Sequence, residues 1–173
     1  MNRRTTNTRT VSFEIPTGIN PSAIIRLLHN HVGFIKLNPV VIDVTKVATD
    51  PIEYEDKWFL ASATQPPIET YRLSSAITIL PLIGRKGQKL IEFETSLQST
   101  ANGLRSKADA AMDVSVWSHW WVDTMDEGTH GNTDSTLSVE RTVECAWWVM
   151  PFVTSTYDGV HASVGKQLID GAR

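Results

Sequence analysis

One charged side chain falls on an apolar face in residues 136–148, the most regular strand-like run of the sequence. Alternation places Arg141 on the same face as Leu137, Val139, Val143 and Cys145. A guanidinium in an apolar interior donates strong hydrogen bonds to a carbonyl or carboxylate, because water does not compete there. We therefore select Arg141 as the candidate catalytic residue. The alternative is a bulge or an edge position, from which the long side chain of Arg141 reaches solvent.

The strand-like run of residues 105–122 concentrates aromatic side chains. One of its faces carries Ser118 and Trp120, and the more polar face carries Trp117 and Trp121. We assign Trp120 to the wall of a cavity, with ordinary core packing as the alternative. Exposed tryptophans on the outer face would indicate a homodimer surface.

Two tyrosines on apolar faces could orient a polar group of a bound ligand. Tyr71 begins a strand-like run and Tyr157 lies in a helical run, and a buried phenol needs a hydrogen-bond partner. Anchoring of the core is the alternative for each. The predicted substrate-binding residues are Tyr71, Leu73, Ile77, Phe93, Thr95, Met112, Val114, Val116, Trp120, Val139, Val143, Tyr157 and Val160.

Patterns for metal, nucleotide or thiol chemistry are missing. His29 and His31 are two residues apart, so on a helix they point in different directions. The glycines at 84 and 87 flank a hairpin rather than a strand-to-helix loop that would cradle phosphate. Cys145 alternates with apolar residues and is expected to be a small buried hydrophobe. We expect no metal and no cofactor.

The amino-acid composition argues against some classes of binding partner. The 173 residues include 16 basic and 19 acidic side chains, for a net charge of -3, and no basic stripe suits nucleic acid. No apolar run approaches the roughly 18 residues of a membrane span, and the single cysteine gives no disulfide. We expect a cytoplasmic protein whose partner is a hydrophobic small molecule.

The spacing of apolar residues and the helix-capping residues predict the strands and helices that position these side chains. Residues 9–15 alternate as a strand, Asn20 and Pro21 begin a helix, and residues 32–37 suggest a further helical turn. A long amphipathic helix follows Pro151. We expect one domain over residues 9–173 after a flexible segment, residues 1–8. The strands expected between the helices are residues 40–47, 58–63, 71–80, 90–100, 105–122 and 136–148.

This order resembles the helix-grip fold of the START, Bet v 1 and polyketide-cyclase superfamily. The resemblance is carried by residues 11–21 leading into 24–39, and by residues 140–145 and 150–153 leading into 156–161. Together with Ile79-Leu80-Pro81-Leu82, the ending is similar to a family of small fungal proteins with this fold. The resemblance implies an α+β architecture, in which a curved antiparallel sheet grips a long C-terminal helix around an apolar cavity.

Two functions suit such a cavity. One is a cofactor-independent cyclase or isomerase of fungal secondary metabolism, such as a Diels-Alder pericyclase, which folds a terpenoid or polyketide intermediate while a donor polarises it. The alternative is a noncatalytic carrier of a lipid or hydrophobic metabolite. A hydrolytic or aldol cyclase is less favoured, because Asp113 and His119 are about 20 Å apart in an extended strand.

Overall fold

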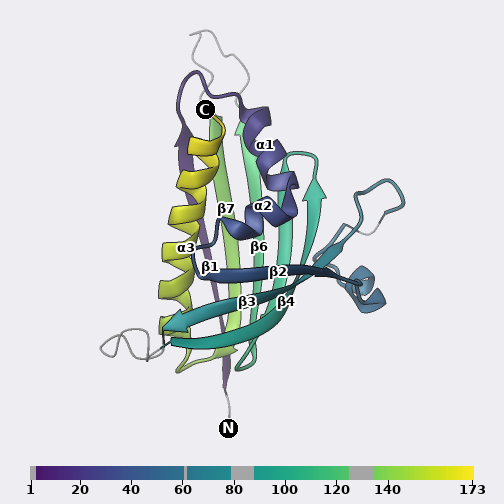
Figure 1. Ribbon diagram of the computed structural model, residues 1–173, viewed down its shortest axis with the longest axis vertical. Coiled ribbons are helices and arrows are strands. Elements are labelled where there is room, and N and C mark those ends of the chain that lie inside the picture. Colours follow the sequence, from purple (N-terminus) through teal and green to yellow (C-terminus); the bar gives the residue numbers. More distant parts are fainter. Residues whose placement is uncertain (1–2, 61, 79–87, 125–134) are drawn as a thin grey trace.

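The computed structural model describes residues 3–60, 62–78, 88–124 and 135–173. In chain order, a strand and two short helices precede a series of strands, and a long helix ends the chain (Figure 1). The elements are β1 (Arg4–Ile15), α1 (Pro21–His29), α2 (His31–Lys36), β2 (Val41–Val47), the 3-10 helix η1 (Pro51–Glu55), β3 (Glu69–Thr78), β4 (Gln88–Thr100), β5 (Gly103–Ala110), β6 (Val114–Thr124), β7 (Ser135–Ala146) and α3 (Met150–Gly171).

The strands form one antiparallel, seven-stranded sheet in the order β1-β7-β6-β5-β4-β3-β2. Consecutive strands from β2 to β7 are neighbours, as hairpin connections predict. β1 instead crosses to the far edge, where it pairs with β7. The sheet curves, and α1, α2 and α3 cover its concave side, so the α+β architecture expected from the sequence is confirmed (Figure 1).

β1 begins earlier than the sequence suggested. Its pairing with β7 runs from Arg4 opposite Ala146 to Ile15 opposite Ser135. Residues 4–8 therefore belong to the strand rather than to a flexible segment. A hydrogen bond between the hydroxyls of Thr8 and Thr142, 2.9 Å long, joins this polar stretch to β7.

The helix signals at the start of the chain are confirmed. Asn20 caps α1 by accepting a 2.9 Å hydrogen bond from the backbone N–H of Ser22, and Pro21 occupies the first turn, where its missing N–H costs nothing. Asn30 caps α2 in the same way, accepting from the backbone N–H of Gly33 at 3.1 Å.

The strand expected at residues 58–63 is wrong for the described residues of that range, which form turns and irregular chain. The backbone N–H of Leu60 donates to the side-chain oxygen of Gln98, 2.7 Å away, and the Gln98 amide donates back to the Leu60 carbonyl at 2.9 Å. The buried amide of Gln98 thus gives the backbone of Leu60 the two hydrogen bonds that a partner strand would supply.

Two other strand boundaries also need correction. The run of residues 105–122 is split by a turn at Met112 and Asp113, whose φ angles of 65° and 54° lie in the left-handed region. β7 stops at Ala146, which leaves Trp147 and Trp148 in the following turn with exposed fractions of 63% and 53%.

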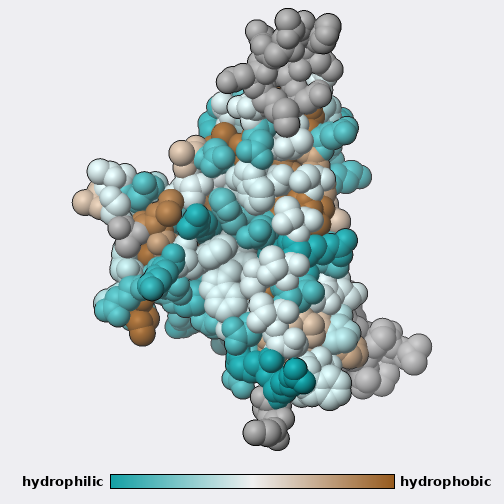
Figure 2. Space-filling model, turned by 180° about the vertical axis from the view of Figure 1, so that it is seen from behind, coloured by the Kyte–Doolittle hydropathy of each residue, from teal (hydrophilic) through white to brown (hydrophobic). Residues whose placement is uncertain are grey.

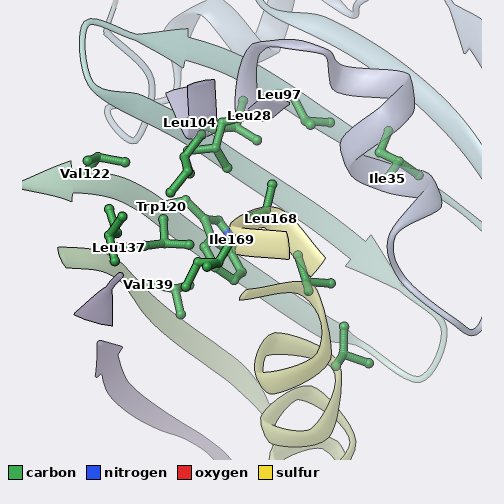
Figure 3. Packing of buried hydrophobic residues seen from close by; sticks show 14 of the residues in the cluster. Leu28, Ile35, Leu97, Leu104, Trp120, Val122, Leu137, Val139, Leu168 and Ile169 are labelled. Atoms are coloured by element: carbon green, nitrogen blue, oxygen red, sulfur yellow. The ribbon is translucent and has the colours of Figure 1, made fainter. Parts of the chain in front are cut away.

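The main core lies between the concave face of the sheet and the helices. Figure 3 shows Trp120 beside Leu137 and Val139 of the sheet, with Leu168 and Ile169 of α3 packed close by. Where α3 crosses β1, Gly165 permits close contact, because a Cβ atom there would lie 2.5 Å from Cζ of Phe13. The opposite side of the molecule is mostly hydrophilic or neutral (Figure 2).

Candidate functional site

A cavity of about 100 Å³ lies between the concave face of the sheet and the helices α2 and α3. Its rim includes half-buried side chains, among them Phe34, Phe93 and Tyr157, so it reaches the surface. The lining residues are Phe34, Ile35, Asn38, Val41, Leu73, Phe93, Thr95, Leu97, Ser106, Ala108, Val116, Ser118, Trp120, Tyr157, Val160, His161 and Val164.

Many of the residues selected from the sequence meet at this cavity. They come from β3, β4, β6 and α3. The inward face of each of these elements was predicted only from the spacing of its apolar residues. These residues are Leu73, Phe93, Thr95, Val116, Trp120, Tyr157 and Val160.

Other selected residues lie elsewhere. Met112 is 60% exposed in the turn between β5 and β6, so the expectation that it faces the cavity is wrong. Tyr71 and Val139 are buried in the main core without bordering the cavity, and Val114 and Val143 belong to a second cluster beneath the start of α3. The side chain of Ile77 lies outside the described part of the chain.

Tyr71 already has a polar partner. Its hydroxyl donates to Oε2 of Glu69 at 2.8 Å, and burial with this carboxylate raises its pKa. Lys46 pairs with the same carboxylate, and Nδ1 of the buried His31 lies 2.7 Å from it. The hydroxyl of Tyr71 is therefore engaged by the carboxylate of Glu69, which also contacts His31 of α2, rather than facing a ligand.

Arg141 is buried, with an exposed fraction of 2%, but does not border the cavity. Its Nη1 donates to Oδ1 of Asp158 at 2.5 Å and to the Thr154 carbonyl at 3.4 Å, and Nη2 donates to Oδ1 of Asn7 at 3.2 Å. Both sequence interpretations are therefore wrong: the guanidinium neither projects into the cavity nor reaches solvent. A buried cation needs a counterion, and α3 supplies it.

Beside the predicted Tyr157, the cavity has a polar lining residue on α3 that was not among the predicted site residues, His161. His161 is 8% exposed, with its ring 5.4 Å from that of Trp120 and 5.8 Å from that of Tyr157. Within the described residues, the side-chain hydrogen bonds of α3 use Thr154, Asp158, Ser163 and Gln167, and none uses His161 or Tyr157. The imidazole and phenol are left to interact with what occupies the cavity.

Burial fixes the charge state of both groups. It lowers the pKa of His161 to about 4, with the nearby Arg141 cation contributing in the same direction. Burial also raises the pKa of Tyr157 to about 12, against the opposing effect of Arg141. At neutral pH the cavity therefore presents a neutral imidazole and a protonated phenol.

Two serines line the sheet side of the cavity. Ser106 of β5 and Ser118 of β6 are direct cross-strand partners, and Ser118 is buried, with an exposed fraction of 6%. The positions of Ser118 and His161 could have been predicted from the sequence. Ser118 alternates in phase with Trp120, and His161 lies one helical turn after Tyr157.

The remaining sequence expectations about chemistry concern metals and the thiol. Among the residues that the structure describes, no three His, Cys, Asp or Glu side chains are placed to hold a metal ion. Cys145 is fully buried, as expected, and burial raises the pKa of its thiol. No helix of the described residues has the length and apolar character needed to span a membrane.

A long helix gripped by a curved seven-stranded antiparallel sheet, with a cavity between them, is the helix-grip, Bet v 1-like fold. Residues 3–173 match a family model described as a domain of unknown function, DUF7053, and the chain belongs to that family. A comparison with curated proteins finds no match.

Solved structures share the fold at low sequence identity. TTHA0849 from Thermus thermophilus is 14% identical with a TM-score of 0.60, over 96% of this chain and 97% of that one. The Zhui aromatase/cyclase from Streptomyces sp. R1128 is 9% identical with a TM-score of 0.60, over 98% and 94%. Ara h 8.0201 is 10% identical with a TM-score of 0.58, over 96% and 99%.

Proposed function

We propose that this chain binds a hydrophobic small molecule in the cavity beneath α3. The observation that carries the proposal is His161: a buried imidazole on the wall of a largely apolar cavity, without a hydrogen-bond partner among the described residues. The ring nitrogens of His161 keep accessible surface within the cavity, so a ligand or a water molecule there can form hydrogen bonds with them. The Bet v 1-like fold agrees with a cavity that receives apolar ligands.

The size of the cavity sets the scale of the ligand. A cavity of about 100 Å³ is somewhat smaller than the engineered apolar cavity of about 150 Å³ that binds benzene. A single ring is thus near the limit of the space present. A terpenoid or polyketide intermediate requires the rim side chains Phe34 and Phe93 to move outward, and both are only half-buried.

The test measures the binding of a small apolar probe to the wild-type chain and to a variant whose cavity is filled by a larger side chain. Methylcyclohexane is titrated while the methyl signals of Val160 and Val164 are followed by NMR. We expect these signals to shift in the wild-type chain and to lose their response in Ala108→Leu, because Ala108 lines the cavity. The control is Ala110→Leu on the same face of β5, where the residue packs on the second cluster instead. Methyl signals that do not respond in the wild type, or that respond equally in Ala108→Leu, would overturn the proposal.

A second candidate function is a cofactor-independent cyclase or isomerase acting on the bound molecule. It is favoured by the placement of His161 and Tyr157 side by side in an apolar cavity, with ring centroids 5.8 Å apart. A protonated phenol can donate to a carbonyl oxygen on which negative charge develops, and the neutral imidazole can accept a proton. The similarity to an aromatase/cyclase structure is consistent with this chemistry, although fold similarity alone does not determine a reaction.

The catalytic candidate is tested on hydrophobic metabolites extracted from the native host. We expect the wild-type chain to convert a component into an isomer of the same mass and a different retention time. Tyr157→Phe should slow that conversion while the component is still retained by the protein, because the variant loses the donor and keeps the ring. Equal rates for Tyr157→Phe and the wild type would rule out the phenol as donor.

A further inference from the structure

We propose that the cavity selects ligands with an uncharged oxygen, a hydroxyl or a carbonyl, held between His161 of α3 and the Ser106–Ser118 pair of the sheet. This inference rests on the proposed binding function and specifies the class of ligand. It comes from three features of the cavity: hydroxyls on the sheet side, an imidazole on the helix side, and no charged side chain among the lining residues that the structure describes.

The sheet side offers two hydroxyls at adjacent positions. Ser106 and Ser118 lie opposite each other in the register of β5 and β6, and both border the cavity. Within the described structure, neither hydroxyl has a protein partner, whereas the hydroxyl of Thr95 on the same wall donates to the Lys107 carbonyl at 3.1 Å. Each serine hydroxyl can donate one hydrogen bond and can also accept hydrogen bonds. The serine pair therefore matches an oxygen that does either.

The helix side offers a group with the same dual capacity. A neutral imidazole has one nitrogen that donates and one that accepts. Because burial lowers its pKa to about 4, His161 is neutral at pH 7 and can bind a hydroxyl through either nitrogen or a carbonyl through its N–H. The rest of its surroundings, the rings of Trp120 and Tyr157, provide apolar contact for the ligand's hydrocarbon part.

The charged residues around the cavity disfavour a carboxylate ligand, because none of them is left to pair with it. The nearby cation, Arg141, already has its two terminal nitrogens engaged by Asp158, Asn7 and the Thr154 carbonyl. Lys107 pairs with Asp56 at 2.9 Å on the other side of the sheet. A carboxylate entering the cavity would thus lose its hydration without gaining a free counterion from the described residues, which is strongly unfavourable.

The experiment compares three ligands that share one cyclohexane ring and differ in its substituent, at neutral pH: methylcyclohexane, cyclohexanol and cyclohexanecarboxylate. Dissociation constants are measured from the methyl signals of Val160 and Val164. We expect cyclohexanol to bind about tenfold more tightly than methylcyclohexane, and the carboxylate to bind most weakly, because only the alcohol satisfies the buried polar groups at no cost in charge. Carboxylate binding as tight as that of the alcohol would overturn the inference.

Variants assign the preference to the named residues. His161→Leu and Ser118→Ala should each reduce the advantage of cyclohexanol over methylcyclohexane by several-fold while methylcyclohexane still binds. Ser115→Ala is the control, since Ser115 lies on the outer face of β6 and donates to Asp109. An unchanged preference in both cavity variants would contradict the inference. Failure of all three ligands to bind the wild-type chain would instead overturn the binding function itself.

Discussion

Arg141 and Asp158 form an ion pair beneath α3, with Nη1 of the arginine 2.5 Å from Oδ1 of the aspartate. The arginine comes from β7 and is 2% exposed, whereas the aspartate lies on α3 and is 34% exposed. The other oxygen of Asp158 accepts from Arg9 of β1. Asp158 therefore ties the helix to two strands at once and neutralises a cation close to the cavity.

The two arginines should differ in their contribution to stability. Asp158→Asn removes the counterion of both arginines and leaves the Arg141 cation buried without one, and we expect a loss of about 3 kcal/mol. Arg9→Ala removes only the exposed partner and should cost less than about 1 kcal/mol. Urea denaturation measures both. Equal losses for the two variants would show that the buried pair contributes no more than a surface pair.

The Arg141 cation also affects the pKa of the His161 imidazole in the cavity. Because Arg141 helps to lower the pKa of His161, Arg141→Met should raise that pKa, although burial still holds it below the ordinary value. NMR titration of the His161 ring protons measures the shift. Arg9→Met is the control and should leave the pKa close to the wild-type value. A pKa that is unchanged in Arg141→Met would contradict the electrostatic coupling.

Acid should destabilise the protein through His161. Its pKa is about 4 in the folded chain, against an ordinary value of 6.5, so between these pH values the unfolded chain binds more protons. The free energy of unfolding therefore falls as the pH drops through this window, by up to about 3 kcal/mol from this residue. His161→Phe should flatten this part of the pH profile relative to the wild type. Identical slopes for the two chains would refute the assignment.

Two glycines of α3 should respond to alanine in opposite directions. Gly165→Ala places a methyl group against Phe13, at 2.5 Å from Cζ, and should destabilise the fold by roughly 1 to 3 kcal/mol. Gly159→Ala has nothing within 4 Å and should stabilise the helix by about 1 kcal/mol. Thermal unfolding of both variants tests the pair, and a stabilised Gly165→Ala would show that Phe13 can move aside.

Local signals predicted most of the fold. The cap at Asn20 and Pro21 and the alternation of β7 depend on neighbouring residues, which a sequence shows directly. The errors occur where a distant group decides the structure. Residues 58–60 are all apolar, which is compatible with a buried strand, but the side chain of Gln98 satisfies both backbone groups of Leu60. The turn at Met112 lacks the glycine that normally marks a left-handed conformation.

The site was predicted in part for the same reason. Alternation identified the inward face of each strand, and so placed Val116 and Trp120 correctly on the concave side. It could not determine which stretch of that face borders the cavity, since that depends on where α2 and α3 cross the sheet. Val114 and Val143 consequently face the second cluster. The partner of Arg141 lies on another element, Asp158 of α3, which alternation along one strand cannot reveal.

The pairing of β1 with β7 has a consequence for how the chain is made. Arg4 lies opposite Ala146, so the strand synthesised first has no partner until the strand synthesised last among the seven is complete. At about 5 to 20 residues per second, the ribosome leaves β1 unpaired for many seconds. During that interval its backbone donors and acceptors form an open edge, to which a chaperone or another nascent chain can bind before the sheet closes.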